Sequence, residues 1–223
     1  MEVFSLPPAT VVNRAVPKNA FDSYTSGKQK RLFTDLIQRI TWTHKLSSET
    51  VNLEAKEIKE IQVFKVELKS LETIDPLLAI IDRAIPYNII FIVKYEANMY
   101  LSTSVKHHHA VNEDNAVIDW TFKTDWFTGD ENKYTLVLKK SLDAVYLDFC
   151  IQLSGRPELA KKSLQEFVEQ CRTFDRLSKE VNRLKAALAS CKQFNQKVRL
   201  NIQLKETENS LNKLVKHNSS NYS

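Results

Sequence analysis

Residues 66–69 carry the two side chains in this chain whose types and spacing best resemble a catalytic motif. Glu67 and Lys69 stand two positions apart in a segment of strand character, where alternation would place both on one face. In metal-dependent nucleases of the PD-(D/E)xK type, such an acid holds Mg²⁺ and the lysine polarises the scissile phosphate or the attacking water. Those nucleases also need a second acid on a neighbouring strand or turn, which the upstream sequence does not clearly supply. A solvated strand face is therefore the first interpretation, and a nuclease using Glu67 and Lys69 is the alternative.

No other polar cluster has the spacing of a metal or nucleophile site. Residues 107–109 are three consecutive histidines, whose rings cannot converge on one ion without an unusual backbone, so an exposed loop is expected. Asp119, Asp125 and Asp130 surround two tryptophans that could line a pocket, although aromatic residues at such spacing usually form sheet core. The chain has three glycines in all and no glycine-rich phosphate loop. We therefore expect no metal and no cofactor.

Composition and charge indicate where the protein acts. The three cysteines stand about 20 residues apart without a CxxC pair, which is typical of a reduced, cytoplasmic setting. No segment reaches about 18 consecutive apolar residues, so no membrane contact is expected. Residues 1–155 carry 18 Lys and Arg against 20 Asp and Glu, whereas residues 156–223 carry 14 against 7. The basic excess therefore belongs to the last third of the chain.

The patterns upstream of residue 155 predict an α+β domain over residues 28–155. Residues 1–27 hold three prolines without a hydrophobic period, which indicates an extended N-terminal arm. Apolar residues at helical spacing predict one helix over 28–46, and Asp75-Pro76 and residues 142–153 predict two more. Strands are expected in a mostly antiparallel sheet of four or five strands with flanking helices, from the segments 58–69, 88–95, 99–105, 116–127 and 134–138.

Residues 156–217 form a helical extension with no proline or glycine after Pro157. Its seam residues alternate at spacings of four and three, which is typical of coiled-coil packing, and comprise Leu177, Val181, Leu184, Leu188, Cys191, Asn195, Val198 and Ile202. One continuous rod would reach roughly 90 Å, too long for its own domain to cover. The segment is therefore a coiled-coil arm or a helical hairpin, with a bend expected within residues 195–201. Residues 218–223 are expected to form a disordered tail.

The flanks of this seam favour an acidic partner helix or, alternatively, the acidic-leaning N-terminal part of this chain. With Val181 at heptad position a, the cations Lys185, Lys192 and Arg199 all fall at position e, where a parallel homodimer offers them no acids. Asn195 at an a position favours one register. Residues 181–205 contain six cations and no acid, so contact with DNA phosphates is an alternative use of this arm.

Several stretches resemble the bacterial family called domain of unknown function 4391. They are LPPATVVNRAVPK, KRLFTDLIQRITWTHKLSSETVNL, EIQVFKVELK, the IDRAIPYNIIFIV join and DWTFKTDWF, and the likeness runs from residue 5 to about residue 215. Members are small proteins often encoded beside helicase and DNA-methyltransferase genes in defence islands. The resemblance thus implies an accessory subunit of an antiviral, restriction-like system, and it supplies no catalytic residues. The run of histidines at 107–109 departs from the family pattern.

The resulting functional expectation is a non-catalytic adaptor rather than an enzyme. Its α+β domain would be joined to a larger helicase or methyltransferase partner through the C-terminal arm. The expected partner-binding residues are Leu177, Val181, Leu184, Lys185, Leu188, Lys192, Asn195, Val198, Arg199 and Ile202.

Overall fold

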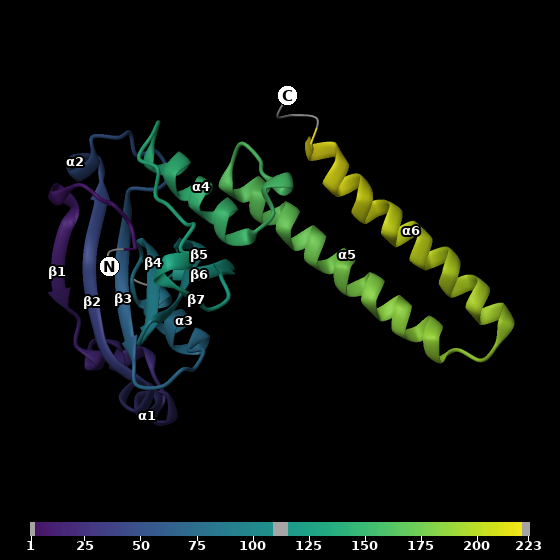
Figure 1. The fold of residues 1–223 in the computed structure, drawn as a ribbon, viewed down its shortest axis with the longest axis horizontal. Helices are drawn as coiled ribbons and strands as arrows, with labels where there is room; N and C mark the ends of the chain where they lie inside the picture. Colours follow the sequence, from purple (N-terminus) through teal and green to yellow (C-terminus); the bar gives the residue numbers. More distant parts are fainter. Residues whose placement is uncertain (1–2, 109–115, 220–223) are drawn as a thin grey trace. The chain divides into compact units, whose positions relative to one another are not determined.

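The computed structural model describes residues 3–108 and 116–219 (Figure 1). The chain divides into two compact units, Met1–Gly155 and Arg156–Ser223, which we call the body and the hairpin unit. His109 and the end of the expected disordered tail lie outside the described residues. Residues 218 and 219 of that tail belong to the last helix.

The body is built on one mixed sheet of seven strands. Six strands lie in sequence order and the short β7 pairs with β5, so the expected count of four or five strands is wrong. All neighbours are antiparallel except β3 and β4, which are parallel and joined by the crossover helix α3. The strands are β1 (Val11–Ala15), β2 (Ile37–Ser47), β3 (Glu60–Leu68), β4 (Asn88–Tyr95), β5 (Asn98–His108), β6 (Ala116–Lys123) and β7 (Phe127–Thr128). The mostly antiparallel α+β class is confirmed.

The body's helices begin where local chemistry satisfies their first amide groups. Ser26 and Gln29 form a reciprocal capping box at the start of α1, and Pro76 occupies the first turn of α3. The α-helices are α1 (Gly27–Leu36), α2 (Ser48–Val51), α3 (Asp75–Ala84) and α4 (Leu142–Ser154). Short 3-10 helices are η1 (Pro8–Thr10), η2 (Lys18–Tyr24) and η3 (Gly129–Glu131).

The helix predicted over residues 28–46 is wrong in its second half, because α1 ends at Leu36 and β2 begins at Ile37. Residues 40–43 are isoleucine, threonine, tryptophan and threonine, which favour a strand once β3 offers a partner. Lys69 donates its Nζ proton to the Thr34 carbonyl at 2.7 Å and its backbone N–H to the Leu36 carbonyl at 2.9 Å. Lys18 Nζ donates to the Ile37 carbonyl. The last carbonyls of α1 are thus satisfied by tertiary contacts.

The structure adds detail to the N-terminal arm and corrects one further expectation for the body. The N-terminal arm contains β1, which pairs with β2, and it anchors Phe4 edge-on against Phe149 of α4 with ring centroids 5.6 Å apart. Residues 134–138 form no strand, although Leu136 is buried. Both differences arise because pairing and packing partners far away in sequence decide the conformation of short segments.

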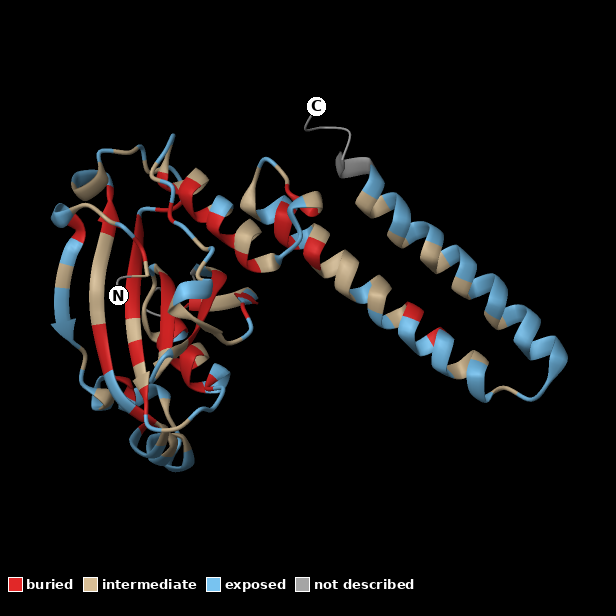
Figure 2. Ribbon diagram, viewed as in Figure 1, coloured by how far each residue is buried: buried red, intermediate tan, exposed pale blue. Residues whose placement is uncertain are grey.

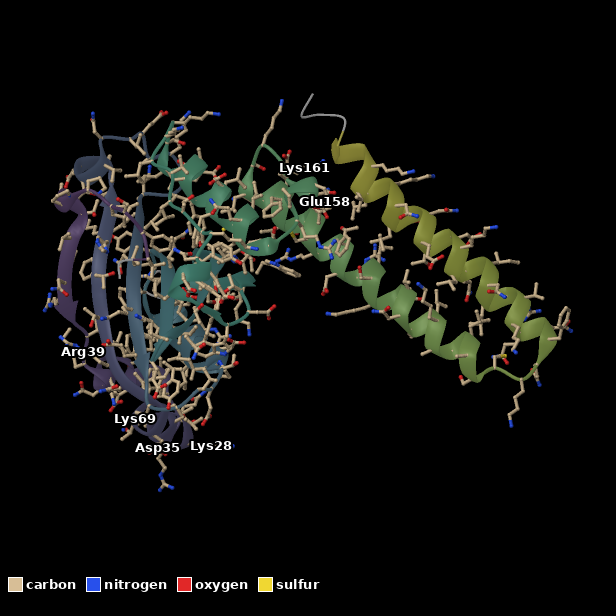
Figure 3. The ribbon with its side chains drawn as sticks, in the orientation of Figure 1. Lys28, Asp35, Arg39, Lys69, Glu158 and Lys161 are labelled. Atoms are coloured by element: carbon tan, nitrogen blue, oxygen red, sulfur yellow. The ribbon has the colours of Figure 1, made fainter. Side chains whose placement is uncertain are left out.

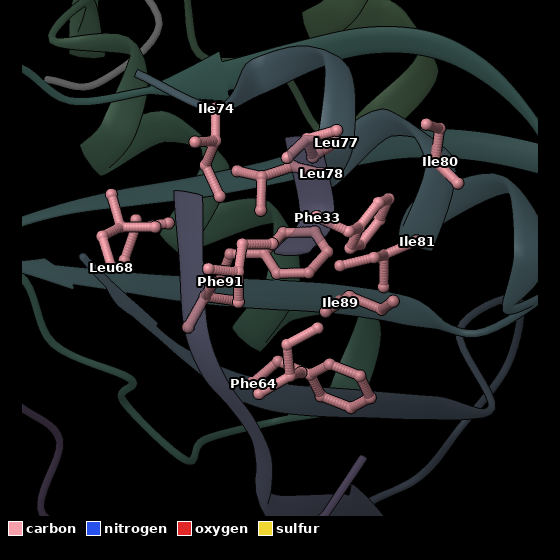
Figure 4. Close-up of a cluster of buried hydrophobic side chains, with 14 of the residues drawn as sticks. Phe33, Phe64, Leu68, Ile74, Leu77, Leu78, Ile80, Ile81, Ile89 and Phe91 are labelled. Carbon is pink, nitrogen blue, oxygen red and sulfur yellow. The ribbon is translucent and has the colours of Figure 1, made fainter. Parts of the chain in front are cut away.

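The sheet buries a core on each face. On one face, Phe64 and Phe91 belong to a cluster with Phe33 of α1 and with Leu77 and Ile81 of α3 (Figure 4). On the other face, the alternating residues Ile61, Val63 and Ile90 are fully buried, and α4 packs there. Tyr146 of α4 donates its hydroxyl proton to the Ser104 carbonyl at 2.8 Å. The body therefore has helices on both faces of its sheet.

The hairpin unit consists of η4 (Pro157–Leu159), α5 (Leu164–Ser190) and α6 (Phe194–Ser219). The bend lies at residues 191–193, so the expected position within 195–201 is wrong. Ser190 ends α5 by donating its hydroxyl to the carbonyls of Ala186 and Ala187, at 3.2 and 3.1 Å. Cys191 is in an extended conformation, and its thiol donates to the Gln193 carbonyl at 3.5 Å. Between the two forms considered for the extension, this chain adopts a helical hairpin.

Candidate functional site

The inner face of the hairpin is where α5 and α6 pack together. On α5, Val181 and Leu184 are buried and Leu177 and Leu188 are half-buried. On α6, half-buried residues recur at spacings of four and three, namely Leu200, Leu204, Thr207, Leu211 and Leu214, and Glu208 and Val215 beside them are half-buried as well. A stripe with this period is what one helix presents to a single neighbouring helix. The α5 half of the predicted seam therefore lies on the inner face.

One ion pair joins the two helices across this face. Lys185 of α5 lies 3.0 Å from a carboxylate oxygen of Glu208 on α6. The other ion pairs within α5 join residues three or four positions apart, as for Arg183 and Glu180 at 2.7 Å. Sequence reasoning assigned Lys185 to an external partner because a parallel arrangement gives it no acid. The antiparallel return of the chain brings Glu208 to it.

The α6 half of the predicted seam lies on the outer face of the hairpin. Asn195, Val198, Arg199 and Ile202 are all exposed, with 43% of Val198 and 54% of Ile202 accessible to solvent. None of the described α6 residues is buried, and this helix is drawn almost wholly in the exposed and intermediate colours of Figure 2. The ten predicted partner-binding residues are therefore divided between two faces and the bend.

Phe194 belongs to this outer surface and was missed by the sequence reasoning. It is 78% exposed, the highest value among the large exposed hydrophobic residues of the described chain. Phe194, Val198 and Ile202 stand four residues apart, so their side chains follow one another along α6. We call these three residues the α6 ridge. Only the position of the bend could have shown that Val198 and Ile202 lie on a different face of the hairpin from Val181.

Cations surround the α6 ridge. Lys197 is three residues after Phe194, Arg199 is three residues before Ile202, and Lys205 is three residues after Ile202. Residues at this spacing are neighbours on a helix surface. These three cations and Lys192 in the bend are exposed, and they form no ion pair within the described part of the chain. The ridge is thus an apolar strip flanked by four cations, with the acid Glu206 four residues beyond Ile202.

Glu67 and Lys69 do not form a metal-binding pair in this structure. Glu67 forms an ion pair with Lys65 on its own strand at 3.1 Å, and the residues opposite it on β2 and β4 are Arg39 and Lys94. The Lys69 ammonium group binds the Thr34 carbonyl, as described above, and Figure 3 shows this residue at the end of the sheet beside α1. Cations thus occupy the positions where a nuclease needs further acids. Lys69 instead binds a carbonyl group at the C-terminal end of α1.

A buried ion pair links α3 to the sheet. Lys106 Nζ donates to Asp82 Oδ1 at 3.0 Å, to the Asp82 carbonyl at 2.7 Å and to the Ile85 carbonyl at 2.7 Å. The two side chains are 1% and 2% exposed. Burial raises the pKa of Asp82 and lowers the pKa of Lys106, and their mutual attraction opposes both shifts. All three ammonium protons have acceptors and water is excluded, so this pair has the geometry of a structural element rather than of a catalytic one.

Two further polar contacts lie on the surface of the body. His107 and Asp119 contact each other at 2.8 Å on the exposed surface. In residues 3–108 and 116–219, no group of three or more His, Cys, Asp or Glu side chains could hold a metal ion. Burial, followed by the charge of Asp125, raises the pKa of Tyr134, which packs against Phe127 with ring centroids 5.5 Å apart. Tyr134 is thus held by packing against an aromatic neighbour.

The fold and the surface together define a two-part α+β protein, in which a helical hairpin carries the exposed apolar strip. Residues 4–211 match the family described as Domain of unknown function (DUF4391), and the chain belongs to that family. Comparisons with curated proteins and with solved structures gave no match. Among the described helices, none combines the length and the apolar character needed to cross a membrane.

Proposed function

We propose that this protein is a non-catalytic adaptor that docks through its hairpin unit onto a larger partner protein. The observation that carries the proposal is that α6 leaves apolar side chains exposed along a helix in which no described residue is buried. A single pair of helices has only one seam to bury, and helices of this length gain most of their stability from packing an apolar face. A second protein surface would supply that packing.

The kind of partner follows from the family resemblance described above. A small protein encoded beside helicase and DNA-methyltransferase genes fits the role of an accessory subunit in a restriction-like antiphage complex. In this complex the hairpin unit would bind the larger subunit, and the body would be held beside it. In this proposal the larger subunit performs the chemistry.

The described geometry supports the nuclease alternative less well. Glu67 is paired with Lys65 and Lys69 is engaged with α1, so neither side chain is held ready for Mg²⁺ or for a phosphate. A change at these two positions should therefore leave assembly intact. The double variant Glu67→Ala, Lys69→Ala serves as the matched control for the experiment below.

The experiment is co-expression with a helicase or DNA-methyltransferase subunit, the partner class that the family resemblance implies, followed by size-exclusion chromatography with mass measurement. The full chain and the Glu67→Ala, Lys69→Ala variant should co-elute with the subunit, whereas a chain lacking residues 156–223 should elute alone. The fluorescence of the three tryptophans, which all belong to the body, checks that the shortened chain is folded. Co-elution of the folded, shortened chain would refute the adaptor role of the hairpin. Loss of Mg²⁺-dependent DNA cleavage in the double variant would instead support the nuclease.

A further inference from the structure

We propose that the α6 ridge binds an acidic amphipathic helix of a partner protein, an inference that rests on the adaptor function and specifies its docking surface. The ridge is three exposed apolar side chains on successive turns of α6, Phe194, Val198 and Ile202. Successive turns present such residues to a partner that offers apolar residues at the matching spacing of three and four. The ridge therefore has the geometry of a helix-binding strip.

Charge selects which helix can dock. Lys197, Arg199 and Lys205 are neighbours of the ridge on α6, and Lys192 lies in the adjoining bend. No Asp or Glu occurs from Val181 to Lys205, and the first acid after the ridge is Glu206, four residues beyond Ile202. A partner helix with glutamates or aspartates beside its apolar stripe would complement these cations, and a basic helix would be repelled.

The same charge argues against a second copy of this chain as the occupant. Symmetric pairing of two α6 ridges would bring Lys197, Arg199 and Lys205 of one copy near the same cations of the other. Some cations elsewhere on the hairpin are already paired, as Lys185 is with Glu208 and Arg183 with Glu180. The cations at the ridge are left for a partner of opposite sign.

Nucleic acid fits the ridge less well than an acidic helix does. Phosphates would satisfy the four cations, but a phosphate backbone offers nothing apolar to Val198 and Ile202. An acidic amphipathic helix satisfies the charged and the apolar side chains together. Among the residues of the ridge, Phe194 should contribute most, because large aromatic side chains dominate binding energy at interfaces.

The test titrates the full chain into a labelled heptad peptide with leucine at positions a and d and glutamate at e and g. A peptide with lysine at e and g is the charge control. We expect saturable binding of the acidic peptide only. Phe194→Ala should weaken it roughly thirtyfold, the factor that corresponds to an interface hot spot. Leu71→Ala is the matched control, because Leu71 is 53% exposed in the body, against 54% for Ile202, and it should bind as the unmodified chain does.

A charge-reversed variant sharpens the test. Lys197→Glu combined with Arg199→Glu should transfer the preference from the glutamate peptide to the lysine peptide. Equal binding of both peptides, or unchanged binding by Phe194→Ala, would overturn the proposal. So would a mass doubling of the chain alone that Phe194→Ala abolishes, since the occupant would then be a second copy. Displacement of the peptide by a DNA duplex whose own affinity is insensitive to Phe194→Ala would assign the surface to nucleic acid and also overturn it.

Failure of this inference is distinguishable from failure of the adaptor function. If Phe194→Ala and Ile202→Ala leave the co-expressed complex intact while removal of residues 156–223 disrupts it, the hairpin docks through another face. The adaptor function then stands and the ridge proposal falls. If the shortened chain still forms the complex, the adaptor function of the hairpin falls, and the peptide titration alone decides the chemistry of the ridge.

Discussion

Replacing Lys106 by methionine should destabilise the body strongly. The carboxylate of Asp82 is buried, and Lys106 is the cation that forms an ion pair with it. The change removes an ammonium group that binds Asp82 Oδ1 and two carbonyls at the end of α3. Breaking a buried pair by removing one partner costs about 3 to 5 kcal/mol, since the remaining charge stays buried without its ion-pair partner. The free energy of unfolding of the body should fall by about that amount.

The cost should depend on pH in a direction that the structure fixes. Burial raises the pKa of Asp82, and Lys106 opposes that rise, so removing Lys106 raises the pKa further. An acid whose folded-state pKa exceeds its unfolded value binds more protons in the folded state, so stability decreases as pH rises above the unfolded pKa of about 3.9. Below that pH both states are protonated and the carboxylate imposes no penalty. Lys106→Met should therefore cost less at pH 5 than at pH 8.

The assay is urea unfolding followed by tryptophan fluorescence, which reports on the body because Trp42, Trp120 and Trp126 all belong to it. Lys123→Met is the matched control. It removes an ion pair with Asp75 at the opposite end of α3, where the side chains are 37% and 48% exposed, and it should cost less than about 1 kcal/mol. The double variant Asp82→Leu, Lys106→Met should recover part of the loss, because an apolar pair leaves no buried charge. If Lys106→Met costs no more than Lys123→Met, or its cost is independent of pH, the pair does not anchor α3.

Three further predictions concern other contacts. Asp143 accepts hydrogen bonds from the backbone N–H groups of residues 56–58. Burial alone would raise the pKa of Asp143, but these donors outweigh burial and the pKa is lowered. The contribution of Asp143 to the stability of the body is therefore present above about pH 4 and is lost as pH falls through the folded-state pKa. Asp143→Ala should cost about 1 kcal/mol at pH 7, a low value because the site is partly exposed, and the cost should shrink in acid urea titrations. Leu184→Ala should destabilise the hairpin by about 2 to 4 kcal/mol and remove hydrogen-exchange protection from α6 while the tryptophan transition stays unchanged; retained protection would contradict the inner-face assignment. Glu208→Lys should loosen the hairpin by less than about 1 kcal/mol, and adding Lys185→Glu should restore the midpoint of α6 exchange.

The sequence determined the elements whose signal is local. The Asp75-Pro76 pair predicted the start of α3, the alternating segment at 58–69 predicted β3, and the glycine at 155 predicted the end of α4. The division of charge along the chain and the seam of threes and fours predicted a helical extension, and the structure has α5 and α6 there. Such signals depend on neighbouring residues alone, so no tertiary partner is needed to interpret them.

The segments that the sequence misjudged or left undescribed depend on distant partners. Ile37 and Ile40 continue the helical spacing of the residues before them, but β3 pairs with this segment and Lys69 satisfies the carbonyls at the end of α1. The N-terminal arm contains a strand only because β2 offers it an edge. The intrinsic secondary-structure preference of a short segment contributes less free energy than pairing along a whole strand. The tertiary arrangement therefore decides the conformation of such a segment.

For the candidate site, the sequence determined the composition and the tertiary structure decided which residues are accessible. A single stripe from Leu177 to Ile202 is visible in the amino-acid pattern, together with cations and no acids beside it. The bend at residues 191–193 cannot be deduced from that stripe, since the heptad period continues through it. The bend turns Val181 and Leu184 inward, where α6 covers them, and leaves Phe194, Val198 and Ile202 in solvent. Periodicity fixes which side chains share a face of one helix, and only the return of the chain fixes which faces meet.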